Sequence, residues 1–292
     1  MTTHHSSSLC RSLILCCLVT AGCIPSDPPR SQSAEVQRLL GDERYEWVTI
    51  ETLNTRIHLP VGSYAQANRD VLPERAEESR AAVLRLLRES EYTNTMELFY
   101  VDSRQDMENL TGSPATGFAY YRDAAVVLVF NESWRAFERH ELTHVVTLGT
   151  WQTPAGPAVV EGLATYVDGD CGGYEHGRIT RTMLDMGALL QLETLGGDFR
   201  RQDDLVAYLQ AASTMEFMVQ RLGPDVMHLL WIRGLRAAPG LLETSVGEFE
   251  SQFENWLSST YDPLPAGAWD AIRNGGCGID TAGGRVDLLP ER

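Results

Sequence analysis

The order of hydrophobic patterns along the chain is the feature that most constrains its fold. From residue 133 onward, apolar residues recur at helical spacing and charged residues occupy the other positions. Before that point, short runs rich in β-branched and aromatic residues predict strands, and a long amphipathic helix is expected over 65–91. The segment 102–112 begins with Asp and Ser, which are good N-cap residues, and ends in Gly. Strands followed by helices predict the α+β class. The expected strands are 45–52, 55–60, 96–101, 117–121 and 124–130, and the expected later helices are 133–148, 159–167, 178–192, 203–222, 224–236 and 246–259.

The N-terminus carries the signature of an exported protein. Arg11 precedes the apolar run LILCCLVTAG, which is too short to span a membrane and is typical of a secretory signal. The run ends at Cys23, and a polar segment follows. This arrangement resembles a bacterial lipoprotein signal, although Thr20 stands where that pattern prefers Leu. We expect a signal over 1–22, a tether over 23–36 and a lipid on Cys23 that anchors the chain to a bacterial membrane. The alternative is ordinary cleavage and secretion.

The net charge and the cysteine content limit the possible binding partners and the cellular compartment of the protein. The net charge is −16 and all 24 basic residues are arginine, which argues against a nucleic-acid partner and against electrostatic docking to anionic lipid. Contact with a membrane is therefore expected through the lipid anchor only. Two cysteines remain beyond the signal and Cys23, namely Cys171 and Cys277. In an oxidising compartment they could pair, or both could remain free thiols.

The stretch HELTH, residues 140–144, carries the candidate chemistry. His140 and His144 lie four apart, so on a helix they share one face about 6 Å apart along the axis and can bind one metal ion. Neutral imidazole suits zinc, and Glu161, in the next apolar run, can supply a third ligand. Glu141 lies beside the same face, where it can take a proton from water. The alternatives are a helix with two hydrogen-bonded histidines, or a closed structural zinc site.

HELTH followed by EGLATYV resembles the gluzincin branch of zinc metallopeptidases, in particular the bacterial peptidase MA-like domains. The resemblance covers roughly residues 45–260 and implies a domain over 37–261, with an irregular tail over 262–292. It implies His140, His144 and Glu161 as ligands of Zn²⁺, and Glu141 as general base and acid. The implied fold is a zincin-like small mixed sheet packed on the HExxH helix, above a C-terminal helical lobe. Strand 124–130 stands where the family has the edge strand that pairs with extended substrate.

The same resemblance suggests one further site residue and contains two departures. Gluzincins use a Tyr or His on a later helix to stabilise the oxyanion, and Tyr208 opens a helix of similar layout. The rivals are Tyr166, His176 and His228, of which His228 is expected in the core. Aminopeptidases of this group bind the free α-amine of the substrate with a glutamate, and this glutamate is missing from the predicted hairpin at 117–130. Thr165 stands where several gluzincins place a histidine-orienting carboxylate, and Asp168 is a weaker substitute.

Together these features predict a zinc-dependent metallopeptidase that hydrolyses peptide bonds in a peptide or protein substrate. The alternative is a catalytically inactive, membrane-anchored module that keeps a peptidase-like fold for binding. An intact Glu141 favours the enzyme, because a binding module needs no base beside its metal.

Overall fold

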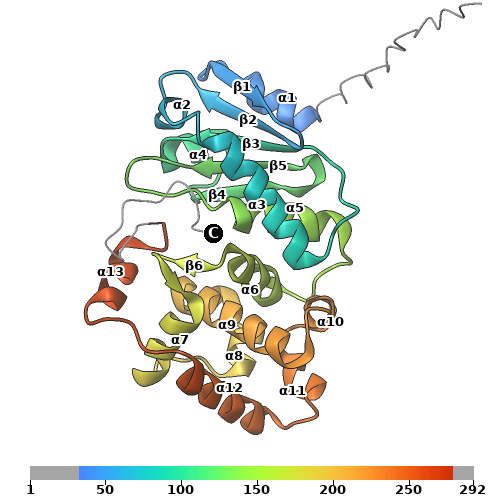
Figure 1. Cartoon of the computed structure of the whole chain (residues 1–292), viewed down its shortest axis with the longest axis vertical. Coiled ribbons are helices and arrows are strands. Elements are labelled where there is room, and N and C mark those ends of the chain that lie inside the picture. The colour runs from blue at the N-terminus through green and yellow to red at the C-terminus, as the bar shows by residue number, and fades with distance from the viewer. Residues whose placement is uncertain (1–32, 279–292) are drawn as a thin grey trace, which may run out of the picture. The chain divides into compact units, whose positions relative to one another are not determined.

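The computed structural model describes residues 33–278, and its sheet confirms the α+β class. Five strands form one mixed sheet in the order β1-β2-β3-β5-β4, in which β2, β3 and β5 run parallel and β1 and β4 run antiparallel to their neighbours. Helices dominate the chain after the sheet (Figure 1). The strands are β1 Trp47–Glu51, β2 Thr55–Pro60, β3 Met96–Val101, β4 Gly117–Tyr120 and β5 Ala125–Val129.

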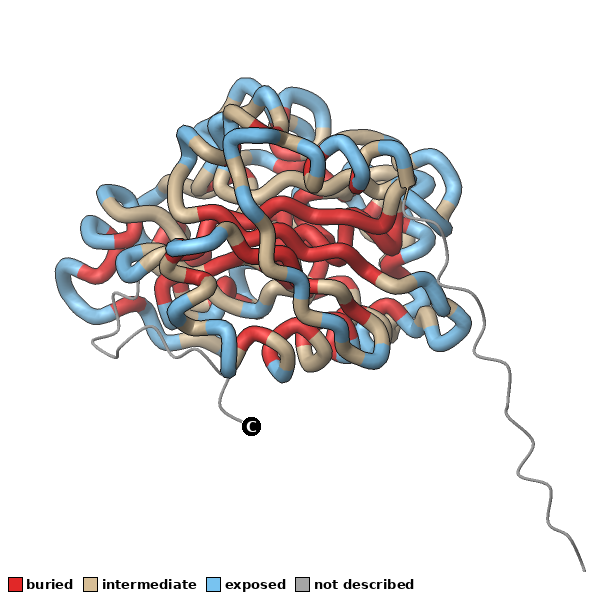
Figure 2. The backbone as a smooth tube through the Cα atoms, turned by 90° about the horizontal axis from the view of Figure 1, so that it is seen from above, coloured by how far each residue is buried: buried red, intermediate tan, exposed pale blue. Residues whose placement is uncertain are grey.

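Helices cover both faces of the sheet, which explains why β3 and β5 are buried along their whole length. Leu98 and Val126 point into a core shared with α3 (Leu72–Leu87) and α5 (Glu138–Thr150). Phe99 and Val127 point the other way, towards α1 (Ala34–Leu40) and α4 (Arg104–Thr111). Buried positions accordingly run continuously along the central strands (Figure 2).

The helical region after the sheet is organised around α6 and α9. A Cβ added at Gly162 of α6 would lie 2.8 Å from the Cβ of Ala211 in α9, so glycine is what allows the two helices to approach this closely. No helix within residues 33–278 is long and apolar enough to cross a membrane. The remaining elements are α2 Tyr64–Ala67, α6 Pro157–Asp168, β6 Asp170–Cys171, β7 Tyr174–Glu175, α7 His176–Asp185, α8 Leu192–Gly197, α9 Asp204–Leu222, α10 Val226–Arg233, α11 Ala238–Leu241, α12 Val246–Thr260 and α13 Ala268–Gly275.

A buried ionic network fixes the start of α5 against the sheet. Glu138 is 3% exposed and forms an ion pair with Arg75 of α3, with 2.6 Å between Nε of Arg75 and Oε1 of Glu138. The hydroxyl of Tyr100 on β3 donates to the same carboxylate at 3.0 Å. Because the network joins three elements, it sets the position of the helix that carries HELTH.

Helix α5 begins later than the pattern from residue 133 predicted. The backbone N–H of Trp134 donates to Asn131 and that of Arg135 donates to the carbonyl of Gly278. These bonds hold the segment outside the helical conformation, so the first helical residue is Glu138.

The hairpin at 117–130 was predicted correctly, but the wrong one of its two strands was expected at the edge of the sheet. Strand β5 pairs with β3 on one side and with β4 on the other, so residues 124–130 do not form the edge. Strand β4 is the last strand of the sheet. In the hairpin, β4 pairs with the edge of β5 that β3 leaves open. A periodic sequence pattern cannot show along which edge of a strand its hairpin partner lies.

Both ends of the described chain contain a helix that was not expected. Residues 34–36, assigned to the tether, begin α1, whose N-cap is the Ser33 side chain and whose Val36 is buried against the sheet. The prediction of an irregular tail from residue 262 is wrong for α13, where Trp269 and Ile272 share one buried face. Short helices of this kind are obscured by flanking Gly and Pro. The predicted signal and the lipid site Cys23 lie outside the described residues.

Candidate metal centre

Three of the predicted site residues converge. The Nε2 atoms of His140 and His144 lie 3.1 Å apart, and Oε2 of Glu161 lies 3.5 Å and 3.4 Å from them. The two histidines come from α5 and the glutamate from α6, and this buried group could hold a metal ion. Two imidazole nitrogens and one carboxylate oxygen directed at one point form a donor set that suits zinc and leaves a coordination position open.

The Glu161 carboxylate is held in its charged form. Burial alone would raise its pKa, but hydrogen bonds with His140 and His144 outweigh burial and hold the pKa well below its usual range. Its second oxygen, Oε1, accepts a hydrogen bond from Nη2 of Arg200 at 3.1 Å. The carboxylate is therefore anchored through one oxygen and directed at the histidines through the other.

Glu141 lies on the same helix, between the two histidines in sequence, and is buried. Burial raises its pKa to about 7, and His144 opposes this rise while Glu161 adds to it. The first residue of β4 makes room for the carboxylate: a Cβ on Gly117 would lie 2.2 Å from Oε1 of Glu141. Edge strand and candidate base are thus in contact, at a position where only glycine leaves space.

No family model matches the chain, and no curated protein matches it in sequence. What the structure shows is a buried His–His–Glu group able to hold a metal in an α+β fold. The function therefore has to be argued from the site.

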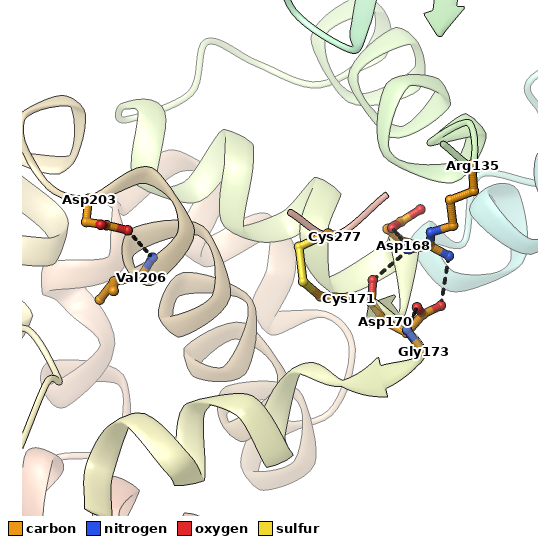
Figure 3. Close-up of a disulfide and its surroundings, with 8 residues drawn as sticks. All are labelled: Arg135, Asp168, Asp170, Cys171, Gly173, Asp203, Val206 and Cys277. Atoms are coloured by element: carbon orange, nitrogen blue, oxygen red, sulfur yellow. Dashed lines mark hydrogen bonds and ion pairs between the residues drawn. A yellow bond between two sulfur atoms is a disulfide. The ribbon is translucent and has the colours of Figure 1, made fainter. Parts of the chain in front are cut away.

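The group opens onto a cavity of about 560 Å³ between β4, α5, α6 and α9. Cys277 lines this cavity and forms a disulfide with Cys171, a pairing that the sequence had left open (Figure 3). Next to it, the guanidinium of Arg135 bonds Asp168 at 3.0 Å and Asp170 at 2.9 Å. Both acids are thereby ion-paired with the same arginine.

Thr165 does not take the role of a histidine-orienting carboxylate. Its hydroxyl is buried one turn after Glu161 and has no hydrogen-bond partner among residues 33–278. Burial raises the pKa of Asp168, one turn further, and the guanidinium of Arg135 and then the imidazole of His140 oppose this rise.

Of the four candidates for oxyanion stabilisation, Tyr208 and His176 line the cavity. The Tyr208 ring stacks parallel to His140 with 6.4 Å between centroids. Burial and then Glu161 raise the pKa of Tyr208, so its hydroxyl keeps its proton. Tyr166 does not line the cavity. His228 is not a core residue as expected, because its side chain is 49% exposed and stacks on Trp151.

His176 is less suited than Tyr208 to donate a hydrogen bond. Burial lowers its pKa to about 4, so the ring is neutral at pH 7. The ring hydrogen-bonds the Asp170 backbone, and Nε2 has no partner among the described residues. The bonded nitrogen is thus Nδ1, which must donate to a carbonyl, and Nε2 is left as an acceptor.

Sequence reasoning did not identify Gly117, Arg135 or Arg200 as parts of the site. Gly117 and Arg135 are close to the HELTH segment only because the sheet edge and the loop before α5 fold back on it. No local pattern marks Arg200, which follows α8 in a short 3-10 turn, Phe199–Arg201.

Proposed function

We propose that the protein is a zinc-dependent metallopeptidase of the gluzincin type that hydrolyses peptide bonds. The observation that carries the proposal is the convergence of His140, His144 and Glu161 beside the buried carboxylate of Glu141. A metal group alone would serve a binding protein equally well. A carboxylate placed next to it, in a cavity beside a sheet edge that pairs with no further strand among residues 33–278, supports hydrolysis of an extended peptide.

The two histidines and Glu161 would hold the zinc ion. Zinc, when bound, supplies a Lewis acid that lowers the pKa of water and polarises a carbonyl group. The fit rests on the donor set, since neutral imidazoles and one carboxylate are common ligands of catalytic zinc. Arg200 keeps the third ligand in place through its other oxygen.

Glu141 acts as the proton carrier in this proposal. It takes a proton from the water that attacks the scissile carbonyl carbon, and it later delivers that proton to the leaving amine nitrogen. The Tyr208 hydroxyl donates a hydrogen bond to the carbonyl oxygen as negative charge develops there. A phenol with a raised pKa remains a donor throughout the working pH range.

The substrate would bind as an added strand on β4. Within residues 33–278 no strand pairs with the outer side of β4, which is the end of the sheet. An extended peptide can hydrogen-bond such an edge through its backbone. Because Gly117 of β4 contacts Glu141, a peptide on this edge would pass close to the candidate base.

Export is part of the same proposal. The signal-like N-terminus supports it, and so does the Cys171–Cys277 disulfide, because disulfides persist in oxidising compartments. We propose a lipid on Cys23. Mass spectrometry of the membrane-associated chain and of Cys23→Ser would test it: the variant should lose the added lipid mass and become soluble, and an unlipidated wild type would contradict it.

The test of function compares the wild type with Glu141→Gln, His144→Ala and a control, Glu254→Gln, which alters an exposed carboxylate on α12. We expect Glu141→Gln to bind zinc normally and to lose at least about 100-fold in kcat/KM on a cleaved peptide. His144→Ala should lose zinc, and the control should match the wild type. Full activity of Glu141→Gln would contradict the assigned base. A wild type that binds zinc and cleaves no member of a peptide library would favour the binding module instead.

A further inference from the structure

Arg200 is the only cationic side chain among the described residues that line the cavity. The other charged groups there are acidic: Glu141, Glu161, Asp168 and Asp170. Asp168 and Asp170 are already paired with Arg135, which does not itself line the cavity. Arg200 is therefore the group in this cavity that can attract an anionic part of a ligand.

The guanidinium of Arg200 has capacity beyond its bond to Glu161. That bond uses Nη2, and Nε and Nη1 make no hydrogen bond to any residue within 33–278. Arg200 lines the cavity and its side chain is 65% exposed, so these donors are accessible to a ligand. A guanidinium presents its N–H groups as a planar fork that matches the two oxygens of a carboxylate.

The bond to Glu161 also fixes how far Arg200 lies from the reaction centre. Nη2 of Arg200 is 3.1 Å from Oε1 of Glu161. The other oxygen of this carboxylate, Oε2, is 3.4 Å from Nε2 of His144. One carboxylate group thus separates the guanidinium from the ligand atoms. An extended chain advances about 3.3–3.6 Å per residue, so a group held by Arg200 lies within about two residues of the scissile bond.

We propose that Arg200 recognises a carboxylate of the substrate within about two residues of the cleaved bond, so that the enzyme prefers peptides that are acidic there. The proposal rests on the proposed function. The carboxylate has two sources, the C-terminal α-carboxylate of a short peptide or the side chain of Asp or Glu. The simpler explanation is that Arg200 only orients Glu161, in which case its removal weakens zinc binding and affects all peptides equally.

Binding to zinc-loaded Glu141→Gln separates these explanations without requiring turnover. Four tetrapeptides, Ala-Ala-X-Ala with X as Glu or Gln and with a free or amidated C-terminus, isolate the two sources. We expect calorimetry to show about 10–100-fold tighter binding of the peptide that carries the recognised carboxylate, which is the range for one charge-assisted hydrogen bond. Arg200→Ala in the same background should abolish the preference, and Arg200→Lys should restore part of it.

Arg201→Ala is the matched control, because Arg201 is the next residue, is 84% exposed and does not line the cavity. It should keep the preference. Equal binding of all four peptides, or a preference that survives Arg200→Ala, would overturn the proposal. Zinc affinity is measured in parallel, and an equal loss for every peptide together with weaker zinc binding would assign Arg200 to orienting Glu161. A wild type without peptidase activity would refute the proposed function, while the binding preference would still decide the role of Arg200.

Discussion

Gly117→Ala tests the contact between the sheet edge and the candidate base. The new Cβ would lie 2.2 Å from Oε1 of Glu141 and 2.7 Å from its Cγ and Cδ, whereas ordinary contacts begin at 3.4 Å. The carboxylate must therefore retreat by about 1.2 Å. A misplacement of about 1 Å in a catalytic group can cost about 100-fold, and complete loss of a general base costs about 10²–10⁴-fold.

The same substitution should leave the protein folded at a moderate cost in stability. Gly117 is not among the glycines with positive φ, so alanine is compatible with its backbone. Crowding costs about 1–3 kcal/mol, partly offset by about 0.4–1 kcal/mol from the reduced entropy of the unfolded chain. We therefore expect kcat/KM to fall about 100-fold or more while zinc content stays close to the wild type and the free energy of unfolding falls by at most about 2.6 kcal/mol.

The assay pairs peptide hydrolysis with zinc analysis and urea denaturation. Gly149→Ala is the control, because it adds the same methyl group on the helix of Glu141 and its Cβ would lie 3.5 Å from the nearest atom, the carbonyl oxygen of Tyr121. Its activity should be unchanged. If Gly117→Ala retained wild-type kcat/KM with zinc bound, the position of Glu141 against β4 would not matter to the reaction.

Three other outcomes follow from buried groups. Cys277→Ser should lower the free energy of unfolding by about 4–5 kcal/mol, because the disulfide spans a sequence separation of 106. Urea denaturation with and without reductant checks this value, and an unchanged denaturation midpoint would contradict it. Arg75→Ala should cost about 3–5 kcal/mol by leaving Glu138 buried and unpaired, whereas the exposed Arg85→Ala on the same helix should cost little in the same denaturation assay. His176 has a pKa of about 4 in the fold and about 6.5 when unfolded, so its contribution, up to about 3 kcal/mol, is present above pH 6.5 and lost as the pH falls towards 4. His176→Gln should therefore give a flatter stability profile between pH 6.5 and 4 in chelator, and an equally steep profile would assign the acid sensitivity to other groups.

The parts of the fold that follow from local periodicity could be predicted from the sequence. The spacing of His140 and His144 is a property of any helix, so their convergence requires only that the segment be helical. Strands 96–101 and 117–121 and the order of strands before helices follow from the same kind of pattern.

The remaining features depend on contacts between distant segments. The contact of Gly117 with Glu141 crosses from the sheet edge to a helix, and the pairing of Cys171 with Cys277 joins residues whose separation has no periodic signature. Arg200 lies in a short turn without pattern, and its role depends on the carboxylate of Glu161, which belongs to another element. Sequence reasoning therefore identified the three residues of the group that could hold a metal ion and missed Gly117, Arg135 and Arg200 around it.

The separation of 106 residues between Cys171 and Cys277 affects when the disulfide beside the cavity can form during biosynthesis. Ribosomes produce Cys171 before its partner, so the two residues cannot be linked until the segment between them has also been made and an oxidant is present. A newly made chain in a reducing compartment thus lacks this covalent link. Formation of the link is in this way coupled to synthesis of the chain as far as Cys277 and to thiol oxidation.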